Sequence, residues 1–170
     1  MTDTNRAYIA QAKSTDWETP LELFDRLWDE FGGFDLDPCC QRGQYTAVKI
    51  LQNGGVICIP PFAYQGSDPQ IYKDGLAQPW FGKVFMNPPY GKGEGDWIAR
   101  AYHQTQSGNA ELVVGLLPVR TDTIRWHKYI HGKAEIRFLK GRLTFVGAPA
   151  SAPFPSCLVI WRKPHKNASH

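Results

Sequence analysis

After Lys83 the chain alternates short apolar runs with segments of helical periodicity, and this pattern limits the fold more than any other feature. Residues 84–86 and 112–117 are apolar almost without interruption, as strands buried on both faces are. Helices are predicted at 96–106 and 121–131, one after each apolar run. Chains that alternate in this way fold as layered α/β structures, so we expect a mostly parallel sheet.

The C-terminal part of the chain breaks this alternation. Strands are predicted at 135–139, 142–146 and 157–162, and no helical segment separates them. Strands joined without a helical crossover pair in antiparallel fashion. The sequence therefore predicts an antiparallel end to an otherwise parallel sheet.

The N-terminal part begins with a helix signal. Thr19 is suited to be the N-cap, Pro20 the first helical residue and Glu22 the partner in a capping box. Apolar residues follow at helical spacing, and glycines end the pattern: Phe24, Leu27, Trp28, Phe31, Gly32 and Gly33. A short strand is predicted at 34–38, where Asp37 and then Pro38 end it, because proline cannot continue a central strand.

The 170 residues are predicted to form one domain with short appendages. We expect a polar arm at 1–15, a domain at 16–165 and a tail at 166–170. Within the domain, 41–79 contains a strand-like run at 56–59 but many prolines and glycines, which predicts a loop-rich insertion. No apolar run is long enough to span a bilayer and the N-terminus is polar, so we expect a soluble, intracellular protein without a membrane partner.

Charge is distributed unevenly along the chain. Residues 1–37 contain nine acidic and three basic residues, whereas 98–170 contain three acidic and eleven basic ones, a net charge of +8. This asymmetry predicts a basic face for a polyanion, although such charges also occur on ordinary solvated surface. The candidate nucleic-acid contacts are Arg120, Arg125, Lys128, Lys140 and Arg142.

The sequence gives little indication of a metal site. The four cysteines, Cys39, Cys40, Cys58 and Cys157, match neither a zinc arrangement nor a disulfide framework, which indicates reduced thiols. His127 and His131 have the spacing of helical metal ligands, but no third ligand accompanies them. We therefore predict no metal.

The tetrapeptide Asn87-Pro88-Pro89-Tyr90 directly follows an apolar strand, where an open α/β sheet places its ligand crevice. The prolines stiffen the turn and remove backbone donors, so the Asn87 side-chain oxygen and the Pro88 carbonyl can both accept from one planar amino group. Tyr90 can stack on the ring that bears the amine, which contributes about 1–3 kcal/mol. Gripping both amine hydrogens favours a pyramidal nitrogen whose lone pair can attack an electrophile. The alternative is a proline-rich turn around a buried asparagine.

Together with six further segments, at 17–20, 34–39, 74–80, 117–123, 141–145 and 152–156, this tetrapeptide resembles the phage-type DNA N6-adenine methyltransferases, the Dam family of phages and prophages. The resemblance implies a Rossmann-like fold and S-adenosyl-L-methionine as cofactor. It places Asp37 and Pro38 at the cofactor-binding turn, and Thr19 and Pro20 over the methionine part of the cofactor. Asp74 is expected near the amino group of the cofactor's adenine. Where many methyltransferases have a glycine-rich loop, this chain has residues 39–42.

The resemblance also implies an activity: methyl transfer to the N6 amine of an adenine flipped out of double-stranded DNA, in the cytoplasm of a bacterial host and from a phage or prophage gene. Two other interpretations remain open. An RNA or protein-glutamine methyltransferase can use the same tetrapeptide, although such relatives usually add a glycine-rich loop and a substrate domain. A catalytically silent DNA-binding module is the second.

Overall fold

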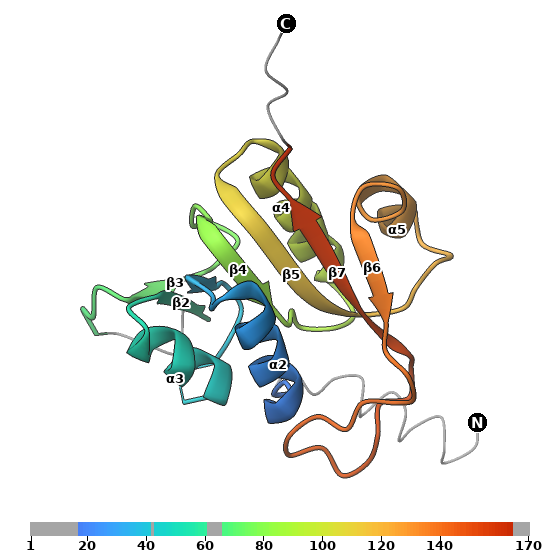
Figure 1. The fold of residues 1–170 in the computed structure, drawn as a ribbon, viewed down its shortest axis with the longest axis horizontal. Coiled ribbons are helices and arrows are strands. Elements are labelled where there is room, and N and C mark those ends of the chain that lie inside the picture. The colour runs from blue at the N-terminus through green and yellow to red at the C-terminus, as the bar shows by residue number, and fades with distance from the viewer. Residues whose placement is uncertain (1–16, 42, 61–65, 165–170) are drawn as a thin grey trace, which may run out of the picture.

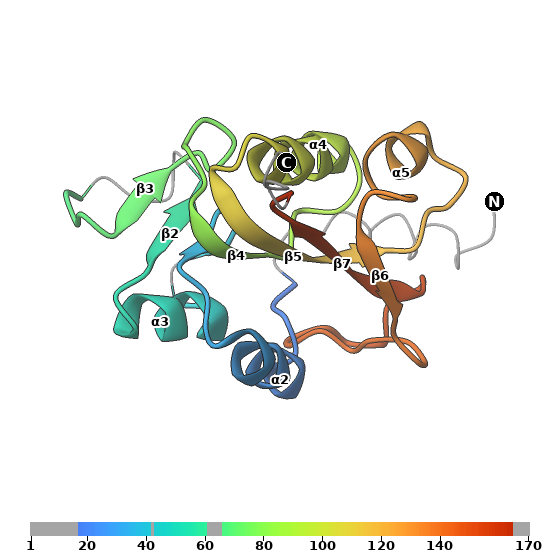
Figure 2. The same cartoon turned by 45° about the horizontal axis from the view of Figure 1, so that its top comes forward.

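The computed structural model describes residues 17–41, 43–60 and 66–164. A single seven-stranded sheet forms its centre (Figure 1). Helices α2 (Leu21–Phe31) and α3 (Tyr45–Gln52) cover one face, and α4 (Glu94–Gln106) and α5 (Ile124–Tyr129) cover the other (Figure 2). No helix in the described ranges is long and apolar enough to cross a membrane.

The strand order is β3-β2-β1-β4-β5-β7-β6. The first five strands in this order are parallel to one another, and β7 is antiparallel to both of its neighbours. The strands are β1 (Leu36–Asp37), β2 (Val56–Ile59), β3 (Ile71–Lys73), β4 (Gly82–Met86), β5 (Ala110–Pro118), β6 (Glu135–Phe138) and β7 (Ser156–Arg162). The predicted Rossmann-like sheet with an antiparallel C-terminal end is confirmed.

The order of the strands creates a crevice in the middle of the sheet. From β1 the chain builds outward through β2 and β3, and it then returns to the other side of β1 for β4 and β5. At such a switch point the loops after the two central strands diverge to opposite faces, and ligands bind between them. The carboxyl ends of β1 and β4 flank the crevice here, with Asp37 at one and Asn87 directly after the other.

The core lies on both faces of this sheet. On the face of α2, Phe24, Phe34 and Phe85 are buried, with the rings of Phe24 and Phe85 4.9 Å apart. On the opposite face, Trp126 and Trp161 are buried, and the Trp161 indole N–H donates to the Tyr129 carbonyl at 2.7 Å. Aromatic side chains therefore fix both layers of helices against the strands.

The first helix differs from the prediction at its start. It begins at Leu21, with Pro20 as the N-cap residue and no side chain capping it, so the predicted Thr19–Glu22 capping box is wrong. The Thr19 hydroxyl is instead a partner of Asn87. The helix ends as predicted, because Gly32 adopts the left-handed conformation at φ 69°.

The segment 41–79 is more regular than its prolines suggested. It supplies α3, β2 and β3, all packed in the sheet layers, so the expectation of a mainly loop-like insertion is wrong for these parts. The strand-like run at 56–59 is β2, as predicted. Helix α3 has only eight residues, and Thr46, Ala47 and Ile50 are its buried ones. So short an apolar stripe gives little periodicity to detect.

The predicted strand at 142–146 is absent. Residues 139–155 form a loop between β6 and β7, in which only Val146 forms a β-bridge, to Glu18. Phe145 is buried, but its ring packs on Trp17 at 5.2 Å rather than in a sheet. The helix predicted at 121–131 is confirmed only for α5, and the other predicted elements after Lys83 differ by a few residues at their ends.

Candidate active site

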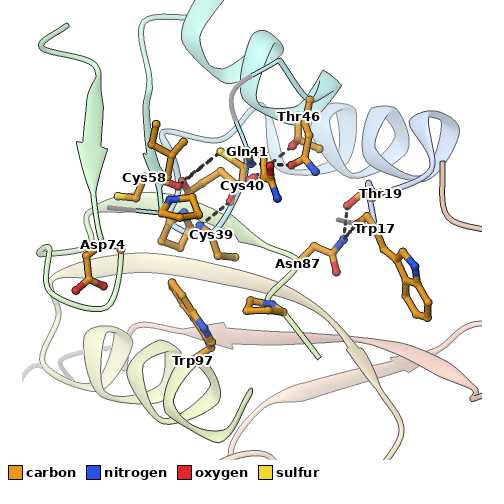
Figure 3. A pocket seen from close by; sticks show the side chains of 17 residues that line it. Trp17, Thr19, Cys39, Cys40, Gln41, Thr46, Cys58, Asp74, Asn87 and Trp97 are labelled. Carbon is orange, nitrogen blue, oxygen red and sulfur yellow. Dashed lines mark hydrogen bonds between the residues drawn. The ribbon is translucent and has the colours of Figure 1, made fainter. Parts of the chain in front are cut away.

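A cavity of about 540 Å³ opens at the carboxyl edge of the sheet, at the switch point (Figure 3). Its size is typical of sites for small molecules. Its walls are formed by the segment before α2 and by the carboxyl ends of β1, β2, β3 and β4 with the residues that follow them. Helices α3 and α4 contribute one side chain each. The cavity brings together six residues that the sequence analysis singled out: Thr19, Asp37, Pro38, Asp74, Asn87 and Pro89.

Asp37 is the buried carboxylate of this cavity, with 2% of its surface exposed. One carboxylate oxygen accepts from the Cys39 backbone N–H at 3.1 Å, and the other accepts from the Thr46 hydroxyl at 3.3 Å. Burial nevertheless raises the pKa of Asp37 to about 7. No basic side chain of the described residues forms an ion pair with it. A cationic ligand would supply the missing countercharge.

Asp74 lies at the rim of the same cavity in a tight turn. Its backbone has a positive φ of 53°, and its carboxylate accepts from the Leu76 N–H at 3.2 Å. The next residue must be glycine, because a Cβ on Gly75 would lie 1.8 Å from the Pro38 carbonyl oxygen. The turns after β1 and β3 therefore touch, and this contact fixes Asp74 relative to Asp37.

The flat wall of the cavity is Trp97, which the sequence analysis did not single out. Its ring stacks on Trp80 with the ring centres 6.3 Å apart and the planes at 25°. Trp80 is buried, and its indole N–H donates to the Gly75 carbonyl at 2.8 Å. Trp97 follows the tetrapeptide on α4, but helical spacing alone does not tell which face of α4 meets the sheet edge.

Three thiols also line the cavity: Cys39, Cys40 and Cys58. Burial raises the pKa of Cys39 and Cys40 well above the usual value, and that of Cys58 to about 12. They are protonated near neutral pH and contribute apolar surface. Within the described ranges no three His, Cys, Asp or Glu side chains form a group that could hold a metal ion.

The Asn87 side chain is held in one orientation. Its amide nitrogen donates to the Trp17 carbonyl at 2.9 Å and to the Thr19 hydroxyl at 3.2 Å, as Figure 3 shows. A carbonyl can only accept, so the amide nitrogen must face Trp17. The amide oxygen therefore faces away from Trp17, where the Tyr90 hydroxyl donates to it at 2.8 Å. One lone pair of this oxygen remains for a ligand.

Tyr90 has a different environment from the one that base stacking requires. Its ring does not line the cavity and packs edge-on against Phe154 at 5.4 Å, Phe145 at 5.9 Å and Trp17 at 6.1 Å. Burial raises the pKa of its hydroxyl well above the usual value, so the hydroxyl keeps its proton and can donate. The structure thus gives Tyr90 a role as partner of Asn87, and stacking on a target base stays a prediction.

Replacing Tyr90 with phenylalanine tests this hydrogen bond. A hydrogen bond of this kind contributes about 0.5–1.5 kcal/mol, so we expect Tyr90→Phe to lower the turnover number about two- to tenfold. Cofactor affinity should not change, because the ring stays in place. Steady-state kinetics with both substrates provide the measurement. Turnover equal to that of the parent would show that the hydroxyl does not orient Asn87.

Two of the candidate DNA contacts meet a buried acid. Glu94 is 1% exposed and accepts from an Arg125 guanidinium nitrogen at 3.0 Å, and Arg120 Nε lies 4.0 Å from the same oxygen. The sequence carries no signal for the burial of Glu94, since an acid at the start of a helix is ordinarily exposed. Lys128, Lys140 and Arg142 are exposed. The last two lie in the loop that leaves the carboxyl end of β6, on the edge that holds the cavity.

Comparison with known proteins gives a family and a fold. The family model described as DNA N-6-adenine-methyltransferase (Dam) matches residues 70–169, which include the tetrapeptide. No curated protein matches significantly. A crystal structure of Thermoplasma acidophilum protein 1320 is similar over 98% of this chain and 100% of that one, at 13% identity and a TM-score of 0.55. The crystal structure of a candidate RNA methyltransferase from Pyrococcus horikoshii is similar over 96% of this chain and 99% of that one, at 12% identity and a TM-score of 0.49.

Proposed function

The chain belongs to the DNA N-6-adenine-methyltransferase (Dam) family, and from this premise we propose that its cavity binds S-adenosyl-L-methionine and serves methyl transfer to the N6 amine of an adenine flipped out of duplex DNA. The observation that carries the proposal is the meeting of Asp37 and Asn87 in one cavity. One group suits a cation and the other an amine. The enzyme would act in the cytoplasm of a bacterial cell, from a phage or prophage gene.

The cavity suits this cofactor in charge and in shape. S-adenosyl-L-methionine, when bound, supplies a methyl group on a positively charged sulfur, and it also carries an ammonium group. Asp37 would hold one of these positive charges, because it lies buried in the wall without a basic partner among the described residues. Trp97 offers a flat surface for the adenine ring of the cofactor, and Asp74 at the rim can accept a hydrogen bond from the amino group of that ring.

The target amine would bind at the tetrapeptide. The free lone pair of the Asn87 amide oxygen and the Pro88 carbonyl would accept the two N6 hydrogens, which withdraws the nitrogen lone pair from the ring. Trp17 and Thr19 support this by fixing the amide orientation beforehand. Preorganised acceptors and aligned reactants are the main catalytic factors in such a displacement. The N6 proton becomes acidic only after the methyl group is attached, so no strong base is needed.

Duplex DNA would approach the carboxyl edge of the sheet. The target base has to leave the stack to reach Asn87, as in other enzymes that act on bases. Lys140 and Arg142 are exposed on this edge, and Arg120 is partly exposed beside it. These side chains would bind phosphates, whereas Lys128 on α5 would contact the flank of the duplex.

Incubating the purified protein with labelled S-adenosyl-L-methionine and separate DNA, RNA and protein fractions tests the proposal. We expect label in duplex DNA, recovered as N6-methyladenine after digestion to nucleosides. Label in RNA or in protein would instead support the corresponding alternative methyltransferase. Binding of DNA without any labelled product would support a silent DNA-binding module.

A further inference from the structure

Glu94 joins two loops that the sequence keeps apart. It follows the tetrapeptide by four residues, and its backbone N–H donates to the Gly91 carbonyl at 3.3 Å. Its other partners, Arg120 and Arg125, lie beyond the carboxyl end of β5. Helices α4 and α5 pack on the same face of the sheet, as Figure 2 shows. Glu94, at the start of α4, is buried and contacts Arg125 of α5. A carboxylate with 1% exposure needs partners, and two arginines supply them.

The two arginines are not equivalent. Arg125 donates a charge-assisted hydrogen bond at 3.0 Å and is 27% exposed, so it neutralises Glu94 directly. Arg120 is 38% exposed and approaches the same oxygen only with Nε, at 4.0 Å. Its Nε is buried and has no hydrogen-bond partner. One carboxylate thus faces two guanidinium groups, which leaves one positive charge in excess on the side of Arg120.

The excess positive charge of Arg120 lies near the tetrapeptide Asn87-Pro88-Pro89-Tyr90. The guanidinium carbon of Arg120 is 5.9 Å from the centre of the Phe154 ring, and this ring packs against Tyr90 at 5.4 Å. Tyr90 in turn donates to Asn87. In the described residues no acid other than Glu94 forms an ion pair with Arg120. The terminal nitrogens of Arg120 are therefore available to an anion near the Asn87–Tyr90 turn, to which Phe154 connects them.

We propose that Glu94 is a positioning residue that directs Arg120 onto a DNA phosphate beside the target adenine, whereas Arg125 only neutralises Glu94. This inference rests on the proposed function. It divides the two arginines, which the sequence analysis treated alike, into one phosphate contact and one structural partner. It also connects phosphate binding with the turn that would hold the amine, since the Glu94 backbone N–H donates to the Gly91 carbonyl just after that turn.

The salt dependence of duplex binding separates the two roles. We would measure the dissociation constant of an adenine-containing duplex from 50 to 300 mM salt for the full chain and for the matched variants Arg120→Gln and Arg125→Gln. Each lost phosphate contact flattens the log–log slope by about 0.9. We expect the full change for Arg120→Gln. Arg125→Gln leaves Arg120 as the only basic partner of Glu94 among the described residues, so it should give a smaller change in slope and mainly lower the melting temperature. Equal slopes for the parent and Arg120→Gln, or an equal loss in both variants, would overturn the proposal.

A double-mutant cycle tests whether Glu94 acts through Arg120. We expect Glu94→Gln to flatten the slope and slow methyl transfer in the parent but to leave the slope unchanged in the Arg120→Gln background. A residue with a merely structural role would have the same effect on the slope in both backgrounds, and that result would overturn the proposal. If Glu94→Gln does not fold, the comparison of the two arginine variants remains decisive. A parent that neither binds duplex in a salt-dependent way nor methylates adenine would contradict the proposed function itself.

Discussion

Replacing Asn87 with alanine is expected to lower methyl transfer by at least about 10²–10³-fold and to leave cofactor binding almost unchanged. The magnitude is that of removing one preorganised hydrogen-bonding group from the reacting atoms. Neither neighbour can replace the Asn87 amide oxygen as acceptor of the target amine, because the Trp17 carbonyl and the Thr19 hydroxyl serve to orient the Asn87 amide. Single-turnover rates and the cofactor-induced rise in melting temperature measure the two effects separately.

Thr19→Val provides the matched control. It removes one of the two acceptors of the Asn87 amide nitrogen and keeps the Trp17 carbonyl. The rate should then fall about tenfold or less, because one hydrogen bond is lost and the amide oxygen stays. If Asn87→Ala transfers methyl groups as fast as the parent, the target amine is bound elsewhere.

Replacing Asp37 with asparagine is expected to abolish the stabilisation by S-adenosyl-L-methionine and to make the cofactor-free protein more stable. A ligand stabilises only the state that binds it, so loss of the countercharge should remove the rise in melting temperature at moderate ligand concentration. Asparagine keeps the shape of the side chain, and the Thr46 hydroxyl can accept from it instead of donating. The variant should therefore fold.

The gain in stability depends on pH. Burial raises the pKa of Asp37 from 3.8 to about 7, so between these values the folded protein binds a proton that the unfolded chain has released. The free energy of unfolding then decreases as the pH rises through this range, by at most about 4 kcal/mol from this group. Asp37→Asn should remove that decrease, and its advantage over the parent should be largest near pH 8.

Melting curves at pH 5 and pH 8 without cofactor check this effect. Asp74→Asn is the control, because it removes a carboxylate that is exposed at the rim of the same cavity. An unchanged cofactor response in Asp37→Asn would move the cofactor's charged partner elsewhere, and Asp74 would be the next residue to test.

The parts of the fold that could be predicted are those with long apolar patterns. Strands β4 and β5, helix α4 and the antiparallel end of the sheet follow from consecutive or periodic apolar residues. The tetrapeptide was placed correctly after β4 because strand ends of an α/β sheet carry the site. Asp37 likewise lies at the end of a predicted strand, and Asp37 and Asn87 line one cavity.

Other features depend on contacts between distant segments, which no local pattern reveals. Thr19 has the sequence of a helix cap but binds Asn87, a residue 68 positions away. Leu143 and Phe145 alternate as in a strand, yet Phe145 is buried beneath Trp17. Glu94 and Trp97 have ordinary helical positions, and their roles depend on which face of α4 meets the sheet edge. The single domain at 16–165 stays a prediction.

The central claim is tested most directly by expressing the chain in a bacterial host that lacks adenine methylation and by sequencing the modified positions in its DNA. We expect N6-methyladenine at a defined set of sites in cells that express the parent, and none in cells that express Asn87→Ala at the same level. Genomic DNA without N6-methyladenine in the presence of folded, cofactor-binding parent protein would contradict the account.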